Sequence, residues 1–269
     1  SLLGREAATR IGSLDYVDVQ VSLDGVTAEV NDAVRGDGSF ARARRAMRHL
    51  VDAGVEGFKI SVVATRHNIG QLPAYLDLAT DMGAQLRVTR LRPSGRGVDS
   101  WHHLRPSQQQ QRFLHHWLAD RPEVLTGDSF FHLSALGETL PGLGMCGAGR
   151  TVCLIDPVGD VYACPFAIHD EFFAGSVKDP GGFAAVWRGS ARFAELRTAQ
   201  PGGTCASCSA YGTCRSGCMA AKFFTGQPMD GPDPECALGH GSMEASAPIP
   251  TLSRDHSWTP VAIGARQGR

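Results

Sequence analysis

Hydrophobic and polar positions follow two different periods in the first part of the chain. Three short, β-branched runs predict buried strands: residues 17–23, 58–63 and 85–91. Two longer stretches with apolar side chains at helical spacing lie between them: residues 39–53 and 71–82. The order strand, helix, strand, helix, strand predicts a parallel sheet with right-handed crossover connections.

The first predicted helix has a clear apolar face. Ser39 is its expected N-cap, and Gly54 ends it. The apolar face comprises Phe40, Ala43, Met47, Leu50 and Val51. Residues 27–38 are polar and rich in glycine, so we expect a loop there.

Ligands of such sheets bind beyond the carboxyl ends of the strands. These ends fall at residues 22–25, 64–68 and 92–97. Three parallel strands cannot close a barrel, and a parallel sheet needs both faces and its edges covered. We therefore expect the second half of a larger α/β unit. The first residue, Ser1 in place of methionine, is expected of a fragment or a processed chain.

The pattern becomes irregular further along the chain. A helix is predicted over residues 106–119, with Phe113, Leu114, Trp117 and Leu118 on one face and with His115 and His116 at the surface. Residues 151–155 and 160–164 flank an Asp-Pro-Val-Gly turn and predict a hairpin that brings Cys153 and Cys164 close together. Another helix is predicted over residues 183–197. Residues 241–269 are expected to form a poorly ordered tail.

Composition narrows the function classes. The 269 residues are 42% hydrophobic, which suits a globular protein with a buried core. The net charge is −1, and no run of like charge indicates nucleic-acid binding. No apolar run is long enough to cross a membrane, so we expect a soluble, cytoplasmic protein.

Eight cysteines, all in the C-terminal half, carry the strongest chemical signal. Four of them form a C-x2-C-x5-C-x3-C run: Cys205, Cys208, Cys214 and Cys218. The others are Cys146, Cys153, Cys164 and Cys236. Eight thiolates suffice for two four-ligand sites, and a C-x-x-C turn lets both sulfurs reach one metal centre.

Three interpretations of the cysteines compete. Disulfides require an oxidising compartment, and no secretory signal stands at the start of the sequence. Zinc and iron–sulfur clusters both accept all-sulfur sites, and spacing alone does not separate them.

The cysteine pattern as a whole resembles a known module. Cys146, twelve residues, Gly159, four residues, Cys164, the four-cysteine run and then Cys236 together resemble the SPASM motif. This motif defines the auxiliary-cluster domain of radical S-adenosyl-L-methionine (SAM) enzymes that modify peptides. Upstream, SLDG at residues 22–25 resembles the end of the fourth strand in that family's partial (β/α)6 barrel.

The likeness extends over about residues 1–240. Segments such as VDVQVSLDGVTAEVNDAVRG, LRVTRLRPSGRG and CMAAKFFTGQPMDGPDPEC resemble the mycofactocin radical SAM maturases. Anaerobic sulfatase maturases have similar cysteine spacing but carry an aspartate after the third cysteine. Pro165 follows Cys164 here, which disfavours their chemistry.

The resemblance implies a fold and its domains. We expect barrel strands four to six in residues 1–125, the SPASM domain in 126–240 and the tail in 241–269. It also implies two auxiliary [4Fe–4S] clusters. One would be held by Cys146, Cys153, Cys164 and Cys218, and the other by Cys205, Cys208, Cys214 and Cys236. For Cys153, a role as a small buried hydrophobe is the alternative.

One family feature is missing from this sequence. The C-x3-C-x2-C loop that holds the SAM-cleaving [4Fe–4S] cluster is absent, since no cysteine precedes Cys146. The Gly-Gly-Glu segment that grips the SAM amino group is absent as well. We therefore expect the chain to be unable to cleave SAM by itself, and SAM and the third cluster to be cofactors of the full-length enzyme.

The resemblance further implies a reaction and its partners. The family removes the C-terminal carboxylate of the Tyr of the mycofactocin precursor peptide oxidatively, and then joins this Tyr to the penultimate Val. The expected partners are that peptide, a small peptide-binding chaperone of the same pathway and an electron donor. Ser22, Leu91, Thr65 and Asn68 are candidate SAM-binding residues, although such residues also occur in ordinary loops.

Three arginines at the end of the third predicted strand are candidates for binding a carboxylate. Arg90, Arg92 and Arg96 could bind the carboxylate of the peptide or an anionic group of SAM, or form a solvated basic loop. Two hypotheses of another class remain open. The chain could be a zinc-stabilised binding module or an inactive, cluster-bearing remnant.

Overall fold

The computed structural model describes residues 3–95, 97–126, 129–137 and 140–241. Within them the chain forms two compact units: residues 3–147 with 199–241, and residues 148–198. Residue 125, the predicted domain boundary, lies inside the first unit, which also includes the segment that begins at residue 199. Of the predicted tail, only Gly241 lies within the described residues.

A parallel three-stranded sheet forms the centre of the first unit, as predicted. Its strands are β1 (Gln20–Ser22), β2 (Lys59–Ala64) and β3 (Gln85–Arg90), in the order β1-β2-β3. Val21 pairs with Ile60, and Ile60 pairs with Leu86. Ile60, Val62 and Val88 lie on one face of the sheet and are fully buried there. Val63 and Arg87, on the other face, are only half-buried.

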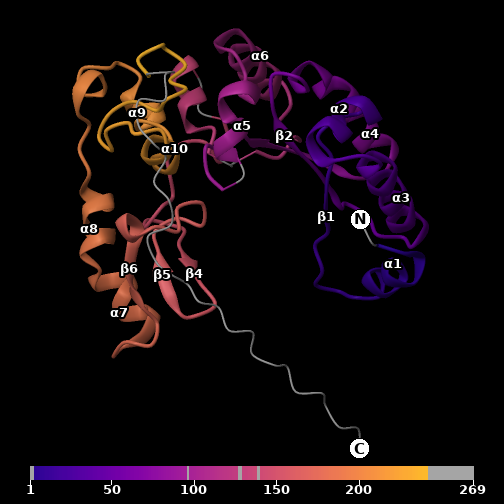
Figure 1. The fold of residues 1–269 in the computed structure, drawn as a ribbon, viewed down its shortest axis with the longest axis horizontal. Coiled ribbons are helices and arrows are strands. Elements are labelled where there is room, and N and C mark those ends of the chain that lie inside the picture. The colour runs from indigo at the N-terminus through magenta and orange to yellow at the C-terminus, as the bar shows by residue number, and fades with distance from the viewer. Residues whose placement is uncertain (1–2, 96, 127–128, 138–139, 242–269) are drawn as a thin grey trace, which may run out of the picture. The chain divides into compact units, whose positions relative to one another are not determined.

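Two crossover helices cover one side of this sheet (Figure 1). They are α3 (Ser39–Asp52) and α4 (Leu72–Asp81), the latter preceded by the 3-10 turn η1 (Ile69–Gln71). Ala43, Met47 and Leu50 of α3 are buried as expected, but Val51 is exposed. Gly83, with φ +60°, follows α4 in the left-handed conformation that favours glycine.

The prediction of a loop over residues 27–38 is wrong. Helix α2 (Ala28–Arg35) occupies most of it, and the side chain of Thr27 accepts a hydrogen bond from Val30 N at its start. Ser39 is not an N-cap either, because it is the first residue of α3 and Gly38 precedes it. The Ser39 hydroxyl instead donates to Asp32 Oδ1. A further helix, α1 (Arg5–Gly12), lies in a segment for which no element was predicted.

The sheet is followed by helices of the same unit. They are α5 (Gly97–Leu104), which was not predicted, α6 (Gln108–Ala119) and the 3-10 helix η2 (Phe131–Leu136). Ser107 and Gln110 form a capping box at the start of α6. The prediction for its faces was partly wrong. His115 is buried and Phe113 is exposed, because α6 packs against η2.

The second unit contains an antiparallel sheet of three strands. These are β4 (Leu154–Ile155), β5 (Asp160–Tyr162) and β6 (Phe173–Ser176), with η3 (Asp170–Phe172) before β6. The predicted hairpin is confirmed, since β4 pairs with β5 and Gly159 N donates to Asp156 O. The predicted single helix over residues 183–197 is wrong.

Two helices stand in its place beside β6 (Figure 1). They are α7 (Gly182–Gly189) and α8 (Ala191–Thr198). The chain breaks at Ser190, whose backbone is extended and whose hydroxyl accepts from Phe193 N in the first turn of α8.

The cysteine-rich segment of the first unit contains only short helices. They are η4 (Gly203–Cys205), α9 (Tyr211–Cys214) and α10 (Met219–Phe224). Among the described residues, none of the helices combines the length and the hydropathy that crossing a membrane requires.

Candidate metal centre

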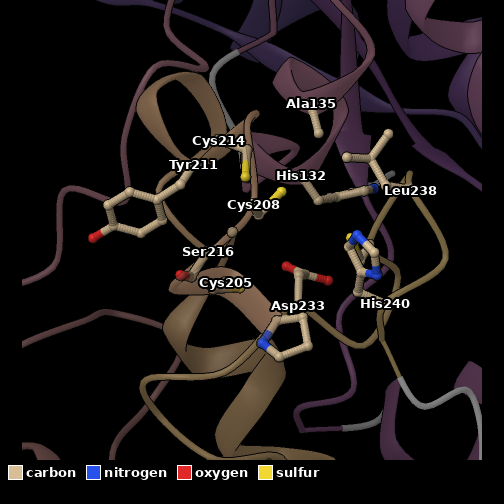
Figure 2. A pocket seen from close by; sticks show the side chains of 13 residues that line it. His132, Ala135, Cys205, Cys208, Tyr211, Cys214, Ser216, Asp233, Leu238 and His240 are labelled. Carbon is tan, nitrogen blue, oxygen red and sulfur yellow. The ribbon is translucent and has the colours of Figure 1, made fainter. Parts of the chain in front are cut away.

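Four thiols line one pocket of the first unit: Cys205, Cys208, Cys214 and Cys236. Cys205 is the last residue of η4 and Cys214 is the last residue of α9. Both thiols line the same pocket. Figure 2 shows Cys205, Cys208 and Cys214 around the pocket together with His132, Asp233 and His240. These four cysteines are the set that the resemblance assigned to a single cluster.

The backbone after Cys214 has an unusual conformation. Arg215, Ser216 and Gly217 all have positive φ angles, of 50°, 63° and 74°. Non-glycine residues adopt this left-handed conformation at a cost of roughly 1–2 kcal/mol each. Such outliers gather at functional sites, where the surrounding structure holds them in place.

Gly217 also allows a close approach. A Cβ atom at this position would collide with the side chain of Asp233. Without it, Asp233 Oδ2 accepts a hydrogen bond of 2.8 Å from Cys218 N. The turn of residues 215–217 therefore follows Cys214, which lines the pocket, and ends at Cys218, whose backbone N–H is held by Asp233.

The electrostatics of the pocket suit an attached cation or metal cluster. Burial raises the pKa of Cys214, and Cys236, Cys205 and Cys208 raise it further, which shows that the four thiols lie within one another's field. Burial also raises the pKa of Cys236, while backbone N–H groups of His240 and Leu238 act in the opposite direction. Thiolates crowded in this way need a positive partner, and N–H groups directed at sulfur are typical of cluster ligands.

Thiols placed around a pocket fit a cluster, whose irons bind the sulfurs separately. Among the residues that the structure describes, no three His, Cys, Asp or Glu side chains are placed to hold a single metal ion.

Cys218 and Cys146, in the same unit, interact electrostatically. Burial raises the pKa of Cys218 to about 12, and Cys146 contributes to this rise. The positive charge of Arg90 acts in the opposite direction. The two other cysteines of the predicted set, Cys153 and Cys164, belong to the second unit, where Cys153 is half-buried and Cys164 is buried.

Arg90 is at the centre of a buried ion network. Its side chain contacts Asp233 Oδ1 at 2.6 Å and Oδ2 at 2.9 Å, and Glu235 Oε2 at 2.8 Å from Nε and 2.6 Å from Nη2. Nη1 also donates to Ser129 O at 2.9 Å. All five N–H groups of a guanidinium are thereby engaged.

These contacts do not fit the predicted role of Arg90 in binding substrate. The residue is 3% exposed and has no donor left over. It is instead a structural tie between the end of β3 and the segment that carries Cys236. Arg92, which is half-buried, donates from Nε to Ser129 Oγ, and Arg96 lies outside the described residues.

The two carboxylates of the network differ in their electrostatics. Burial alone would raise the pKa of Asp233, but Arg90 and the hydrogen bond from Cys218 N hold it below its usual range. Burial raises the pKa of Glu235, and the charge of Asp233 adds to this effect. Arg90 opposes the effect of burial on the pKa of both carboxylates.

The candidate SAM-binding residues lie at the carboxyl end of the sheet. Thr65 is buried, and its hydroxyl has no hydrogen-bond partner among the described residues, so it is available to a ligand. Ser22 and Leu91 are half-buried at the ends of β1 and β3. Asn68 is different, because its amide donates to Asp24 O and Val63 O and accepts from Thr65 N. Asn68 therefore holds the loop together.

Sequence reasoning missed the polar residues that surround the thiols. His132 lines the pocket, is buried, and donates a hydrogen bond of 3.0 Å from Nε2 to Gln111 Oε1. Burial lowers its pKa to about 3, so the ring is neutral. The pair Asp233 and Glu235 stands directly before Cys236 in sequence, and this acidic pair beside a ligand cysteine was the available signal.

The fold is that of radical SAM enzymes with a SPASM domain. The structure of SuiB from Streptococcus suis bound to its precursor peptide SuiA matches with a TM-score of 0.63, 13% identity, and 88% of this chain and 57% of that chain covered. The structure of anSMEcpe with bound AdoMet matches with a TM-score of 0.57, 17% identity, and 81% and 63% coverage. The SPASM family profile, described as an iron–sulfur cluster-binding domain, matches residues 146–215.

Comparison with curated relatives identifies one family within the radical SAM enzymes that carry a SPASM domain. Mycofactocin maturase MftC of Mycobacterium tuberculosis (strain ATCC 25618 / H37Rv) is 60% identical over 257 residues, which cover 94% of this chain and 66% of the relative. The protein of the same name from Mycobacterium ulcerans (strain Agy99) is 60% identical over 259 residues, which cover 94% and 70%. The chain belongs to the mycofactocin maturase family of radical SAM enzymes. It spans about two thirds of the length of these relatives.

Proposed function

We propose that the chain is the cluster-bearing part of a radical SAM peptide maturase that acts on the mycofactocin precursor peptide. The observation that carries this proposal is the pocket lined by Cys205, Cys208, Cys214 and Cys236 in a chain 60% identical to mycofactocin maturases. The pocket supports an auxiliary cluster, and the relatives support the substrate.

The proposal includes two auxiliary [4Fe–4S] clusters. The four pocket cysteines would hold one of them. Cys146, Cys153, Cys164 and Cys218 would hold the other. The electrostatic interaction between Cys146 and Cys218 supports this second set. The assignment of Cys153 and Cys164 to it rests on the family resemblance.

SAM would bind at the carboxyl end of the sheet. There the buried, unpartnered hydroxyl of Thr65 offers a hydrogen bond, and Ser22 and Leu91 border the same edge. Residues Thr65, Ser22 and Leu91 would hold SAM there, and bound SAM would supply radical chemistry in the full-length enzyme. The proposed tasks of this chain are to orient SAM, to hold the peptide and to accept an electron.

The proposed reaction is oxidative decarboxylation of the C-terminal Tyr, followed by its cross-linking to the penultimate Val. In this reaction one hydrogen atom of the Tyr would pass to the radical that SAM would supply. Loss of carbon dioxide then releases one electron, for which the auxiliary clusters are the proposed acceptors. The small chaperone would deliver the peptide, and an external electron donor would reduce the SAM cluster.

Arg92 and Arg96 remain the proposed partners of the peptide carboxylate, since Arg90 is buried at 3% exposure whereas Arg92 is only half-buried. A buried carboxylate needs a cationic or N–H partner. Removing one charge-assisted hydrogen bond costs about 1.5–3 kcal/mol. We therefore expect Arg92→Gln or Arg96→Gln to lower kcat/KM for decarboxylation at least about tenfold.

The test is turnover by the full-length natural protein. It would be incubated with SAM, a reductant, the chaperone and the precursor peptide, and the peptide would be followed by mass spectrometry. We expect the peptide to lose the mass of carbon dioxide and two hydrogen atoms. A precursor with an amidated C-terminus, which lacks the carboxylate, is the control and should remain unchanged.

Two results would count against the proposal. If the enzyme cleaves SAM but the natural precursor keeps its mass, the proposed substrate is wrong. If the Arg92→Gln and Arg96→Gln variants both decarboxylate the peptide at the wild-type rate, the proposed carboxylate partners are wrong.

A further inference from the structure

Lys222 is a buried lysine in the cysteine-rich segment of the first unit. It belongs to α10, which begins directly after Cys218, and it is only 4% exposed. Its Nζ donates to Met229 O at 2.6 Å and to Gly231 O at 3.3 Å. Lysine is almost never fully buried unless it is paired, so this position needs a physical reason.

The partners of Lys222 do not neutralise its charge. Both are backbone carbonyls, and among the described residues no carboxylate oxygen lies within 4 Å of Nζ. Arg90, the other buried cation of this region, contacts two carboxylates. A buried charge without a counter-charge is costly, so the site of Lys222 is built to face an anion.

One carboxylate and three cysteine thiols act on the charge of Lys222. Burial lowers the pKa of Lys222, whereas Asp233, Cys146, Cys205 and Cys218 all act to raise it. Cys205 lines the four-thiol pocket, while Cys146 and Cys218 interact electrostatically with each other. The ammonium group therefore lies in the field of thiols from both proposed cluster sets.

We propose that Lys222 is the shared counter-cation of the two auxiliary clusters and that its charge raises their reduction potentials. This inference rests on the proposed function, because it requires the clusters. A cluster held by thiolates is an anion, and reduction makes it more negative. A nearby fixed positive charge stabilises the reduced form more than the oxidised form, and the protein interior screens this effect only partly.

The expected effect can be stated as a change in equilibrium. Without the charge of Lys222, the equilibrium constant for one-electron reduction of at least one auxiliary cluster should fall at least about tenfold, which is a shift of about 59 mV to more negative potential. A residue that only supports the loop would leave the potential unchanged.

Two variants separate charge from hydrogen bonding. Lys222→Gln keeps a donor for the carbonyls of Met229 and Gly231 but removes the charge. Lys222→Arg keeps the charge. The matched control is Lys178→Gln, which removes the same charge from an exposed lysine. All are made in the full-length natural protein and reconstituted with iron and sulfide under anaerobic conditions.

The measurement is a redox titration followed by electron paramagnetic resonance, with iron and sulfide determined on the same samples. Signals that change when SAM is added belong to the SAM-binding cluster and are set aside. We expect a negative shift of at least one remaining potential in Lys222→Gln, and wild-type potentials in Lys222→Arg and Lys178→Gln. If Lys222→Gln loses a cluster while Lys222→Arg keeps both, a positive charge is required and the inference is supported.

Different results would overturn the proposed function and the proposed role of Lys222. Wild-type protein without clusters would overturn the proposed function itself. Clusters with unchanged potentials in Lys222→Gln, or loss of clusters in Lys222→Arg as well as in Lys222→Gln, would overturn only the role of Lys222.

Discussion

Replacing Arg90 by glutamine is expected to lower the free energy of unfolding by about 3–5 kcal/mol. The substitution leaves Asp233 and Glu235 buried without their cation, and both are 2–3% exposed. Breaking a buried ion pair from one side is costly because an uncompensated charge remains in a medium that solvates it poorly. Chemical denaturation followed by circular dichroism would measure the change.

Arg87→Gln is the matched control on the same strand. Arg87 donates from Nη1 to Gln20 Oε1 in an exposed hydrogen bond. Its loss should lower the free energy of unfolding by less than about 1 kcal/mol. Equal effects of the two substitutions would contradict the structural role that we assign to the Arg90 network. A stable Arg90→Gln variant that failed only in binding peptide would instead support a role of Arg90 in binding the peptide carboxylate.

Single cysteine substitutions should remove single clusters. Cys214→Ala is expected to deprive the four-thiol pocket of its cluster, whereas Cys218→Ala should affect the site that includes Cys146. Since each cluster contains four irons, the chain should lose about four irons per substitution. Iron analysis of anaerobically reconstituted protein measures this loss.

Double substitutions sharpen the assignment. Cys205→Ala combined with Cys214→Ala should lose no more iron than Cys214→Ala alone, because both thiols line one pocket. Cys214→Ala combined with Cys218→Ala should lose the iron of both clusters. If the second pair lost no more iron than Cys214→Ala alone, Cys214 and Cys218 would serve the same cluster and the assignment would be wrong.

The sequence predicted the sheet well because its strands are strongly patterned. The runs that form β1, β2 and β3 are short and rich in β-branched residues, and glycine ends the intervening helices. Helix α2 escaped prediction because Gly36, Asp37 and Gly38 gave its segment the composition of a loop. Its Thr27 cap and the acidic Glu29 in its first turn were present but short-range signals. The break between α7 and α8 was missed for a similar reason, because it depends on the backbone of Ser190 alone.

The family resemblance, and not the cysteine spacing alone, implied the set of thiols that line the pocket. Spacing alone would have grouped Cys218 with its neighbours in the run and left out the distant Cys236. It could not predict the partners of Arg90, since Asp233 and Glu235 lie more than 140 residues away in sequence. The burial of Lys222 was also not predictable. A single lysine in the run MAAKFF carries no pattern, and only the fold shows which groups it faces.

The iron and acid-labile sulfide content of the anaerobically reconstituted chain shows whether the cysteines hold two clusters. We expect about eight irons and about eight sulfides per chain, as two [4Fe–4S] clusters require. Mössbauer spectroscopy would identify the cluster type in the same samples. Stoichiometric zinc without sulfide in anaerobically purified protein would contradict the account and favour a zinc-stabilised binding module.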